Sequence, residues 1–325
     1  MSEIRGSGPR PLKVFVKPGS KAEWICRGYA ARRKVTAKEP PPNAEVIAPG
    51  FKPRPALNLR DRGGKIIPDL VYTNFFIGGS AWDQQNRNKI DIHLAKAMSD
   101  EGLNNVLIQY FRGAPTITST FRPSTLLPGQ APATISQPGV EDLVGQLHRD
   151  GRINGFDFGS TVFNFMLPRD TVLTIDDGSD DQGGSEKKAG EVEEKASSLE
   201  GLGGFHGSIK IGSGRIYYSV GVFSEGGNGI VAFDQPWKNV VATFYHELIE
   251  ARTDADVEEG QVAWVNNEVP SEEIGDIPMT LAGANLSKVM KEVPLSDGSG
   301  TVPIQLMWSN AVNGPEGPIP APHLV

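Results

Sequence analysis

From Asp69 to Arg252 the sequence alternates between segments typical of β-strands and segments typical of helices. The strand-like segments are short, rich in β-branched and aromatic residues, and stop at Gly or Pro. The helix-like segments space their apolar residues three and four positions apart, so that these residues share one face. This order, with hairpin-connected strands before the last helix, predicts an α/β fold built on a mixed sheet.

The boundaries of the expected elements follow from these patterns. The predicted strands are Leu70–Ile77, Thr116–Phe121, Thr161–Leu167, Ser208–Ile211 and Gly214–Phe223. The predicted helices lie over 88–110 (one or two helices, joined near Asp100-Glu101-Gly102), Val140–His148 and Asn239–Arg252. Together these elements are expected to form one domain over 66–325.

The first 65 residues (1–65) differ from the rest and indicate a basic, Pro-rich arm or linker. Proline runs such as Pro40-Pro41-Pro42 exclude continuous helix and central strand, and only Leu12–Val16 is expected to add an edge strand. Residues 1–66 hold 15 Lys and Arg against 5 Asp and Glu, whereas the remainder holds 17 against 34. Two interpretations stay open: the arm seeks an anionic partner, or it lies on the acidic body of its own chain.

Three further features bound the partners and the compartment. No apolar run approaches the roughly 18–20 residues that span a bilayer, and the first residues lack the layout of a secretory signal. The single cysteine, Cys26, excludes internal disulfides and a thiolate-rich zinc site. These features favour the cytoplasm, with export by a non-classical route left open. No nucleic-acid-binding module accompanies the basic residues, which argues against nucleic acid as the partner, and the oligomeric state stays undetermined.

Residues 176–204 interrupt the alternation of strands and helices. They are acidic, rich in Gly, Ser, Lys and Glu, and almost devoid of apolar residues. Such a stretch buries too little surface to offset its ordering entropy, which predicts a mobile insertion within the domain.

The helix predicted over Asn239–Arg252 carries the most specific chemical signal. His246 and Glu250 are four positions apart and therefore project from adjacent turns on one side, as two ligands of one metal ion do. Glu247, next to the first ligand, lies where a general base could activate water. The spacing alone also fits a solvated ion pair on an exposed helix face, so both interpretations stay open.

Several short motifs accompany this helix in a fixed order. They are H-E-L-[apolar]-E-A-x-T-D at His246–Asp254, A-W at Ala263-Trp264, E-I-G-D at Glu273–Asp276 and W-S-N at Trp308–Asn310. With these motifs, and with Gly204-Phe205-His206 and Phe76-Ile77-Gly78-Gly79 before them, the chain resembles the bacterial and fungal relatives of the plant phosphate-induced (Exordium-like) proteins. The similarity covers about 240 residues, from Val71 to Asn310. The chain departs from that pattern at Ala255, where the family usually has Pro, and lacks the cysteines common after E-I-G-D and W-S-N.

The resemblance implies a zincin-like metallopeptidase fold, in which a mixed sheet supports an H-E-x-x-E active-site helix. It also implies that His246 and Glu250 are metal ligands, that Glu273 and Asp276 supply further ligands, and that Glu247 is the base. Peptidase activity is an expectation for this family, and with it a peptide or protein as the substrate or partner.

The ligand types affect the metal and its chemistry. The usual zinc-peptidase helix is H-E-x-x-H, and here the second His is replaced by Glu250. One imidazole and two carboxylates cancel the charge of Zn²⁺ and weaken it as a Lewis acid, while an oxygen-rich shell admits Mn²⁺ or Ca²⁺ more readily. His206 is interpreted as a transition-state hydrogen-bond donor, a ligand or a satisfied turn histidine. The sequence therefore predicts a metal-dependent (zinc) peptidase-like hydrolase, with a non-catalytic, metal-stabilised binding protein as the alternative.

Overall fold

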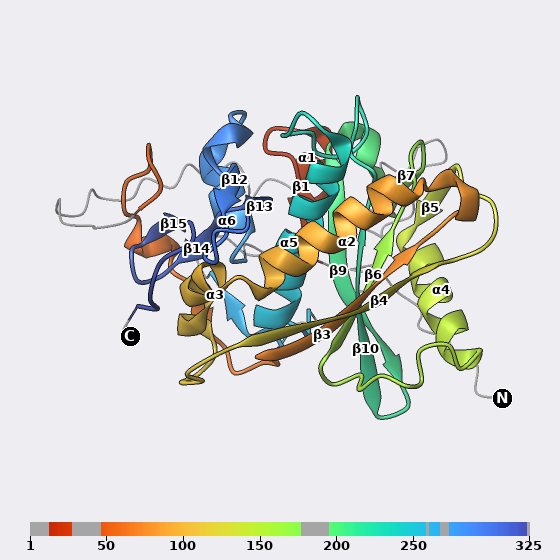
Figure 1. Ribbon diagram of the computed structural model, residues 1–325, viewed down its shortest axis with the longest axis horizontal. Helices are drawn as coiled ribbons and strands as arrows, with labels where there is room; N and C mark the ends of the chain where they lie inside the picture. The colour runs from red at the N-terminus through yellow and green to blue at the C-terminus, as the bar shows by residue number, and fades with distance from the viewer. Residues whose placement is uncertain (1–12, 28–46, 177–194, 258–259, 267–272, 324–325) are drawn as a thin grey trace, which may run out of the picture.

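A mixed six-stranded sheet forms the centre of the protein. The computed structural model describes residues 13–27, 47–176, 195–257, 260–266 and 273–323 (Figure 1). In spatial order the strands of this sheet are β1 (Lys13–Val16), β9 (Leu202–Ile211), β10 (Gly214–Gly221), β6 (Thr161–Met166), β3 (Asp69–Phe76) and β4 (Thr118–Leu126). Strands β10, β6, β3 and β4 are parallel, whereas β9 runs antiparallel to β10 and β1 antiparallel to β9.

Six α-helices and four smaller sheets surround this sheet in the described part of the chain. The helices are α1 (Lys21–Arg27), α2 (Gln84–Ser99), α3 (Glu101–Leu107), α4 (Gln137–Arg149), α5 (Pro236–Thr253) and α6 (Asp276–Ala282). The shorter strands pair as β11 (Trp264–Val265) with β2 (Arg60–Asp61), β12 (Met290–Pro294) with β13 (Thr301–Gln305), β14 (Met307–Ser309) with β15 (Gly314–Glu316), and β5 (Thr134–Ser136) with β7 (Val172–Asp176), which also pairs with β8 (Lys195–Ser197). None of the described helices is long and apolar enough to cross a lipid bilayer.

Helices cover both faces of the central sheet (Figure 1). Helices α2 and α5 pack on one face, where one apolar core includes Tyr72 and Leu248. Helix α4 packs on the other face, where a second core includes Val144. Side chains alternate along each strand, so the consecutive residues Phe165 and Met166 of β6 belong to opposite cores.

The α/β class with a mixed sheet is confirmed, and so are the long elements expected from the sequence. The strand predicted over Leu70–Ile77 is β3, and the helix predicted over Asn239–Arg252 is α5. The segment 88–110 divides into α2 and α3 at Asp100, whose carboxylate caps α3 by accepting a hydrogen bond from Leu103 N.

The described parts of the range 1–65 contribute to the folded body. Strand β1 is the outer strand of the central sheet, as expected, and α1 follows it; residues 28–46 lie outside the described residues. Lys13 and Arg27 pair with carboxylates of the body. The described segment therefore follows the second interpretation of the basic arm, in which it lies on its own acidic domain.

The insertion predicted over 176–204 ends earlier than expected. Residues 177–194 lie outside the described residues, but 195–204 form β8, a short 3-10 helix (Ser198–Glu200) and the start of β9. Ala196 and Leu202 are completely buried there. These few apolar residues anchor the segment to the second core, which the composition of the whole stretch did not indicate.

Candidate metal centre

Helix α5 turns its polar side chains inward. Pro236 stands in the first turn, where the missing N–H leaves no hydrogen bond unmade, and the helix ends at Thr253. Because α5 packs against α2, β13, β9 and β10, its whole circumference is covered. His246, Glu247 and Glu250 are all 0% exposed. The interpretation of this motif as a solvated surface pair is therefore wrong.

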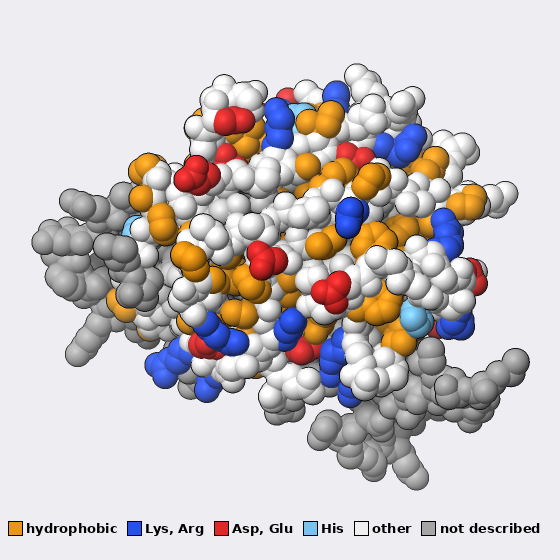
Figure 2. Space-filling model, turned by 60° about the horizontal axis from the view of Figure 1, so that its bottom comes forward, with side chains coloured by type: hydrophobic (Ala, Val, Ile, Leu, Met, Phe, Trp, Pro, Cys, Tyr) orange, Lys and Arg blue, Asp and Glu red, His pale blue; other side chains and the backbone are white. Residues whose placement is uncertain are grey.

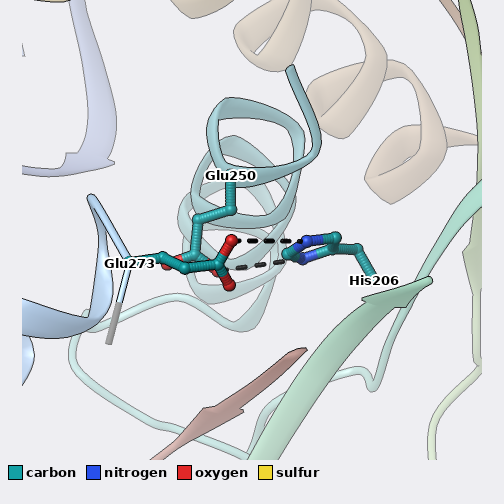
Figure 3. A group of neighbouring side chains, drawn as sticks. All are labelled: His206, Glu250 and Glu273. Atoms are coloured by element: carbon teal, nitrogen blue, oxygen red, sulfur yellow. Dashed lines mark ion pairs between the residues drawn. The ribbon is translucent and has the colours of Figure 1, made fainter. Parts of the chain in front are cut away.

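His206 faces Glu250 from strand β9 (Figure 3). Its Nδ1 lies 3.2 Å from Glu247 Oε2 and 3.8 Å from Glu250 Oε2. The preceding residue, Phe205, belongs to the core on the opposite face, so strand alternation turns His206 toward α5. His206 lies within a strand and inside the cluster, and its interpretation as a turn histidine is wrong.

The loop before α6 supplies a further carboxylate to this cluster. Glu273 Oε1 lies 3.8 Å from His206 Nε2, and His206, Glu250 and Glu273 offer ligand atoms within 4.8 Å of one another (Figure 3). His246, Glu247 and Glu250 form a second group, whose ligand atoms also lie within 4.8 Å of one another. Glu250 belongs to both groups and is therefore the centre of the candidate site.

Asp276 comes from the same E-I-G-D motif but has another partner. Its Oδ1 lies 2.5 Å from a guanidinium nitrogen of Arg27 on α1. Neither of the two ligand groups among the described residues includes it. Of the two acidic residues predicted from this motif, the structure thus brings Glu273, and not Asp276, to the histidines.

A glutamine fixes the orientation of His246. Gln305 Nε2 donates a hydrogen bond to the carbonyl oxygen of Gly275, which leaves its Oε1 facing His246 Nδ1 at 3.0 Å. Since Oε1 is an acceptor, Nδ1 must carry the proton and donate it. Burial lowers the pKa of His246, but Glu250 outweighs this effect and raises it, which favours a proton on Nε2 as well, 3.1 Å from Glu250 Oε2; a bound metal would take the place of that proton.

The cluster holds more acidic than basic side chains. Its buried carboxylates are those of Glu247, Glu250, Asp254, Glu273 and Asp276. Among the described residues, the cations paired with them are Lys13, 3.9 Å from Asp254 and 4.0 Å from Glu273, and Arg27 at Asp276. Buried negative charge in such excess is stable only when protons or further cations balance it.

Many of the atoms that could bind a cation lack a hydrogen bond within the described structure. They are His206 Nε2, His246 Nε2, Glu247 Oε1, Glu250 Oε2 and both carboxylate oxygens of Glu273. Buried polar atoms are nearly always hydrogen-bonded in native proteins, so a convergent set of unsatisfied ones requires a cause. A cation bound among them would supply the missing interactions.

Without a bound cation, protons fill part of this role. Burial, with Glu250 beside it, raises the pKa of Glu247 well above its usual value, and burial does the same to the pKa of Glu273. Burial also acts on Glu250, but the neighbouring His246 outweighs it and lowers the pKa of Glu250. Burial lowers the pKa of His206 to about 4. His206 is therefore neutral at pH 7 and able to bind a metal, beside an ionised Glu250.

Sequence reasoning missed three participants in this cluster. Asp254 was noted only as the last residue of the first motif, yet its Oδ1 accepts a hydrogen bond from Ala263 N and its Oδ2 faces Lys13. Gln305 carried no motif at all. Lys13 alternates with Phe15 in the segment Lys-Val-Phe-Val, and that period of two was the signal that both side chains share one face.

A row of buried polar side chains crosses the sheet toward His206. Asn74, Asn164 and Ser219 occupy matching positions on β3, β6 and β10, and His206 is the register partner of Ser219 on β9. Ser219 Oγ donates to Asn164 Oδ1 (2.7 Å), and Asn164 Nδ2 donates to Asn74 Oδ1 (2.8 Å). Asn74 Nδ2 in turn donates to Asp91 of α2 (2.8 Å). The row holds β10 in register with the inner strands, and so fixes the place of β9 opposite α5.

No family model, curated protein or solved structure matches the chain. The geometry and chemistry of the site therefore carry the functional assignment.

Proposed function

We propose that this chain is a zincin-like, metal-dependent peptidase whose divalent ion binds between helix α5 and strand β9. Glu250 is the shared ligand, with His246 from the same helix, His206 from β9 and Glu273 from the loop before α6. The observation that carries the proposal is the convergence of buried, unsatisfied ligand atoms from these three elements. The 3.1 Å between His246 Nε2 and Glu250 Oε2 is close to the roughly 3.3 Å between ligands of a tetrahedral zinc ion.

The ligand types favour Zn²⁺ over Mn²⁺ and Ca²⁺. Two imidazoles and two carboxylates neutralise a divalent ion and suit Zn²⁺, and Mn²⁺ is the next candidate because it also accepts mixed nitrogen and oxygen shells. Ca²⁺ prefers six to eight oxygen ligands, so the two histidines argue against it.

Glu247 is the proposed proton acceptor. A divalent ion held by these four ligands would need to expand to a fifth position, as catalytic zinc sites can, to polarise a substrate carbonyl and to lower the pKa of a coordinated water. Glu247 Oε2 is held 3.2 Å from His206 Nδ1, while its Oε1 is buried without a hydrogen bond and is free to take a proton. Burial raises the pKa of Glu247, and a positive charge beside it would return it to the carboxylate form that a base needs.

The arrangement of the motifs supports the zincin-like assignment and the resemblance to Exordium-like proteins. The A-W motif meets the helix where Ala263 N donates to Asp254. The W-S-N motif meets E-I-G-D where Trp308 N donates to the carbonyl oxygen of Ile274 at 2.8 Å. The four motifs, which are spread over residues 246–310, thus gather around one cluster, and the antiparallel β9 lies beside the helix with the H-E-x-x-E pattern.

Metal content tests the proposal. Protein purified without chelator is expected to hold about one divalent ion per chain, and His246→Ala at least tenfold less, because it removes a ligand that lies 3.1 Å from the shared ligand Glu250. Elemental analysis measures both. His148→Ala, on α4 in the other layer, is the matched control and should keep the wild-type content. Equal metal in His246→Ala and wild type would exclude this site.

Chelation is expected to destabilise the fold. A ligand present at about 100 times its dissociation constant stabilises the native state by about 2.7 kcal/mol, which for a chain of this size corresponds to roughly 5 °C in the melting temperature. Thermal unfolding with EDTA, and again after adding back excess Zn²⁺ or Mn²⁺, measures the change. A melting temperature that changes neither with EDTA nor with the added metal would contradict a metal bound in this buried cluster.

A specific observation also favours a second function, a non-catalytic, metal-stabilised binding protein. His206, His246, Glu250 and Glu273 are each at most 1% exposed. A metal enclosed by them would stabilise the fold without meeting a substrate. The two functions differ in what Glu247 does, which a substitution at that residue can separate.

A further inference from the structure

The segment Lys13–Arg27 lies over the candidate metal centre and supplies both cations paired with it in the described structure. Lys13 is on β1 and faces Asp254 and Glu273, while Arg27 is on α1 and pairs with Asp276. The Lys13 side chain is only 9% exposed. Burial of a lysine is costly unless its charge is compensated, so the contact depends on the acidic cluster beneath it.

Strand β1 places two side chains directly on the site. It pairs antiparallel with β9, with Lys13 opposite His206 and Phe15 opposite Gly204. The Phe15 ring packs on the imidazole of His246, with ring centroids 4.0 Å apart. Gly204 lets the strands and α5 approach closely, because a Cβ there would lie 2.5 Å from a backbone oxygen of β10. Phe15 and Lys13 thus lie over the residues to which a substrate would need access.

Strand β1 is the weakly held part of this segment, whereas α1 is tied to the body by the close pair of Arg27 with Asp276. Strand β1 has four residues, a single neighbouring strand and a register irregularity between Phe15 and Val16. Its ion pairs are long, at 3.9 and 4.0 Å, so Lys13 neutralises the cluster without close hydrogen bonds. A short edge strand of this kind can leave a sheet at a smaller free-energy cost than an inner strand.

We infer that Lys13–Arg27 is an internal blocking segment, which occupies the β9 edge and covers the metal centre until another extended peptide replaces it. The inference rests on the proposed function, since it names how access to that same site is controlled. The replacing peptide has a basic residue followed two positions later by an aromatic one, because Lys13 and Phe15 set that pattern on the face toward α5.

A weakened blocking segment tests the inference. In Lys13→Met/Phe15→Leu both new side chains are apolar and suit burial, but the charge pairing and the ring contact with His246 are lost. The probe is a fluorescent peptide with the sequence of residues 11–18, Pro-Leu-Lys-Val-Phe-Val-Lys-Pro. In the wild type the tethered segment competes at an effective concentration on the order of millimolar, so micromolar peptide should not bind. The double variant is expected to bind the peptide at least about tenfold more tightly.

The matched control is Lys17→Met/Trp24→Leu. It removes one lysine and one aromatic from the same segment, but both side chains are exposed, whereas the side chains of the cluster are buried. This variant should bind the peptide as weakly as the wild type. A second peptide, with serine in place of the central Lys and Phe, should bind neither variant. Equal affinity of the peptide for all three proteins, or no binding to a folded Lys13→Met/Phe15→Leu protein, overturns the inference.

A second measurement covers the case in which the double variant does not fold. Hydrogen exchange of the wild-type β1 amides is then measured with and without excess unlabelled peptide. Faster exchange in β1, with β9 still protected, supports displacement, and unchanged exchange overturns it. Both experiments are run with EDTA present, because strand replacement needs no metal. A chain that binds no metal but exchanges the strand refutes the proposed peptidase and not the blocking segment.

Discussion

Glu247→Gln is expected to lower peptide hydrolysis by about 10²–10⁴-fold while leaving the metal content unchanged. The amide keeps the size of the side chain and its contact with His206 but cannot accept the proton. Glu247 is not one of the proposed ligands, which are Glu250, His246, His206 and Glu273. The ion should therefore stay bound. The measurement is a digest of a broad peptide library by metal-replete wild type and variant, each at equal metal content.

Two further variants serve as the positive and negative controls for Glu247→Gln. Glu250→Gln should lose both metal and hydrolysis, because Glu250 is shared by both ligand groups. Glu101→Gln, on the exposed start of α3, should change neither. Cleavage by no protein, over the whole library and with Zn²⁺ or Mn²⁺, would point to the metal-stabilised binding protein. In that case Glu247→Gln should cost only metal affinity, by roughly 10–100-fold, as loss of a group that orients a ligand does.

Arg252→Met is expected to destabilise the protein by about 3–5 kcal/mol. Arg252 is fully buried in the last turn of α5, and burial lowers its pKa to about 10, so it stays charged at neutral pH. Its guanidinium donates to the carbonyl oxygens of Pro68 (2.6 Å) and Thr118 (3.1 Å) and to Ser119 Oγ (3.3 Å). Methionine fills a similar volume but leaves these acceptors without their donor, at about 1–3 kcal/mol for each group left unsatisfied.

Urea unfolding gives the free energy of unfolding for this comparison. Arg149→Met, on the exposed end of α4, is the matched control and should stay within about 0.5 kcal/mol of the wild type. A loss below about 1 kcal/mol for Arg252→Met would mean that water reaches the freed carbonyls. The same substitution should also weaken metal binding, since Arg252 ties the end of α5 to the starts of β3 and β4.

The fold was predictable where a segment's own pattern determines its state. Asp100 ends one helix and caps the next by a local hydrogen bond. The apolar residues of α5 recur three and four positions apart along the helix, which predicts it from its own sequence. Ala196 and Leu202 illustrate the limit of this reasoning. Both are single apolar residues at the end of an acidic stretch, and only the partner surfaces supplied by other segments make them buried anchors.

The site residues that share one helix could be predicted from the sequence, whereas those brought together from separate segments were harder to predict. His246 and Glu250 are related by helix geometry alone, whereas Glu273 reaches His206 through a loop whose path depends on its neighbours. Lys13 lies in the expected edge strand, but the sequence did not indicate which strand that edge strand would pair with. Its position depends on pairing with a strand almost 200 residues later, as the register with His206 shows.

The polar row across the sheet has a consequence for how uniquely this chain folds. A slip of β6 or β10 by one residue would turn Asn164 or Ser219 into the apolar core on the α4 side and leave the remaining amides without partners. Each such orphaned group costs about 1–3 kcal/mol, so a misaligned sheet is penalised several times over. Parallel inner strands rich in Val and Phe would otherwise tolerate such slips with little loss of apolar burial. Asn74, Asn164 and Ser219 thus discriminate against misregistered sheets, and only the native alignment brings His206 opposite α5.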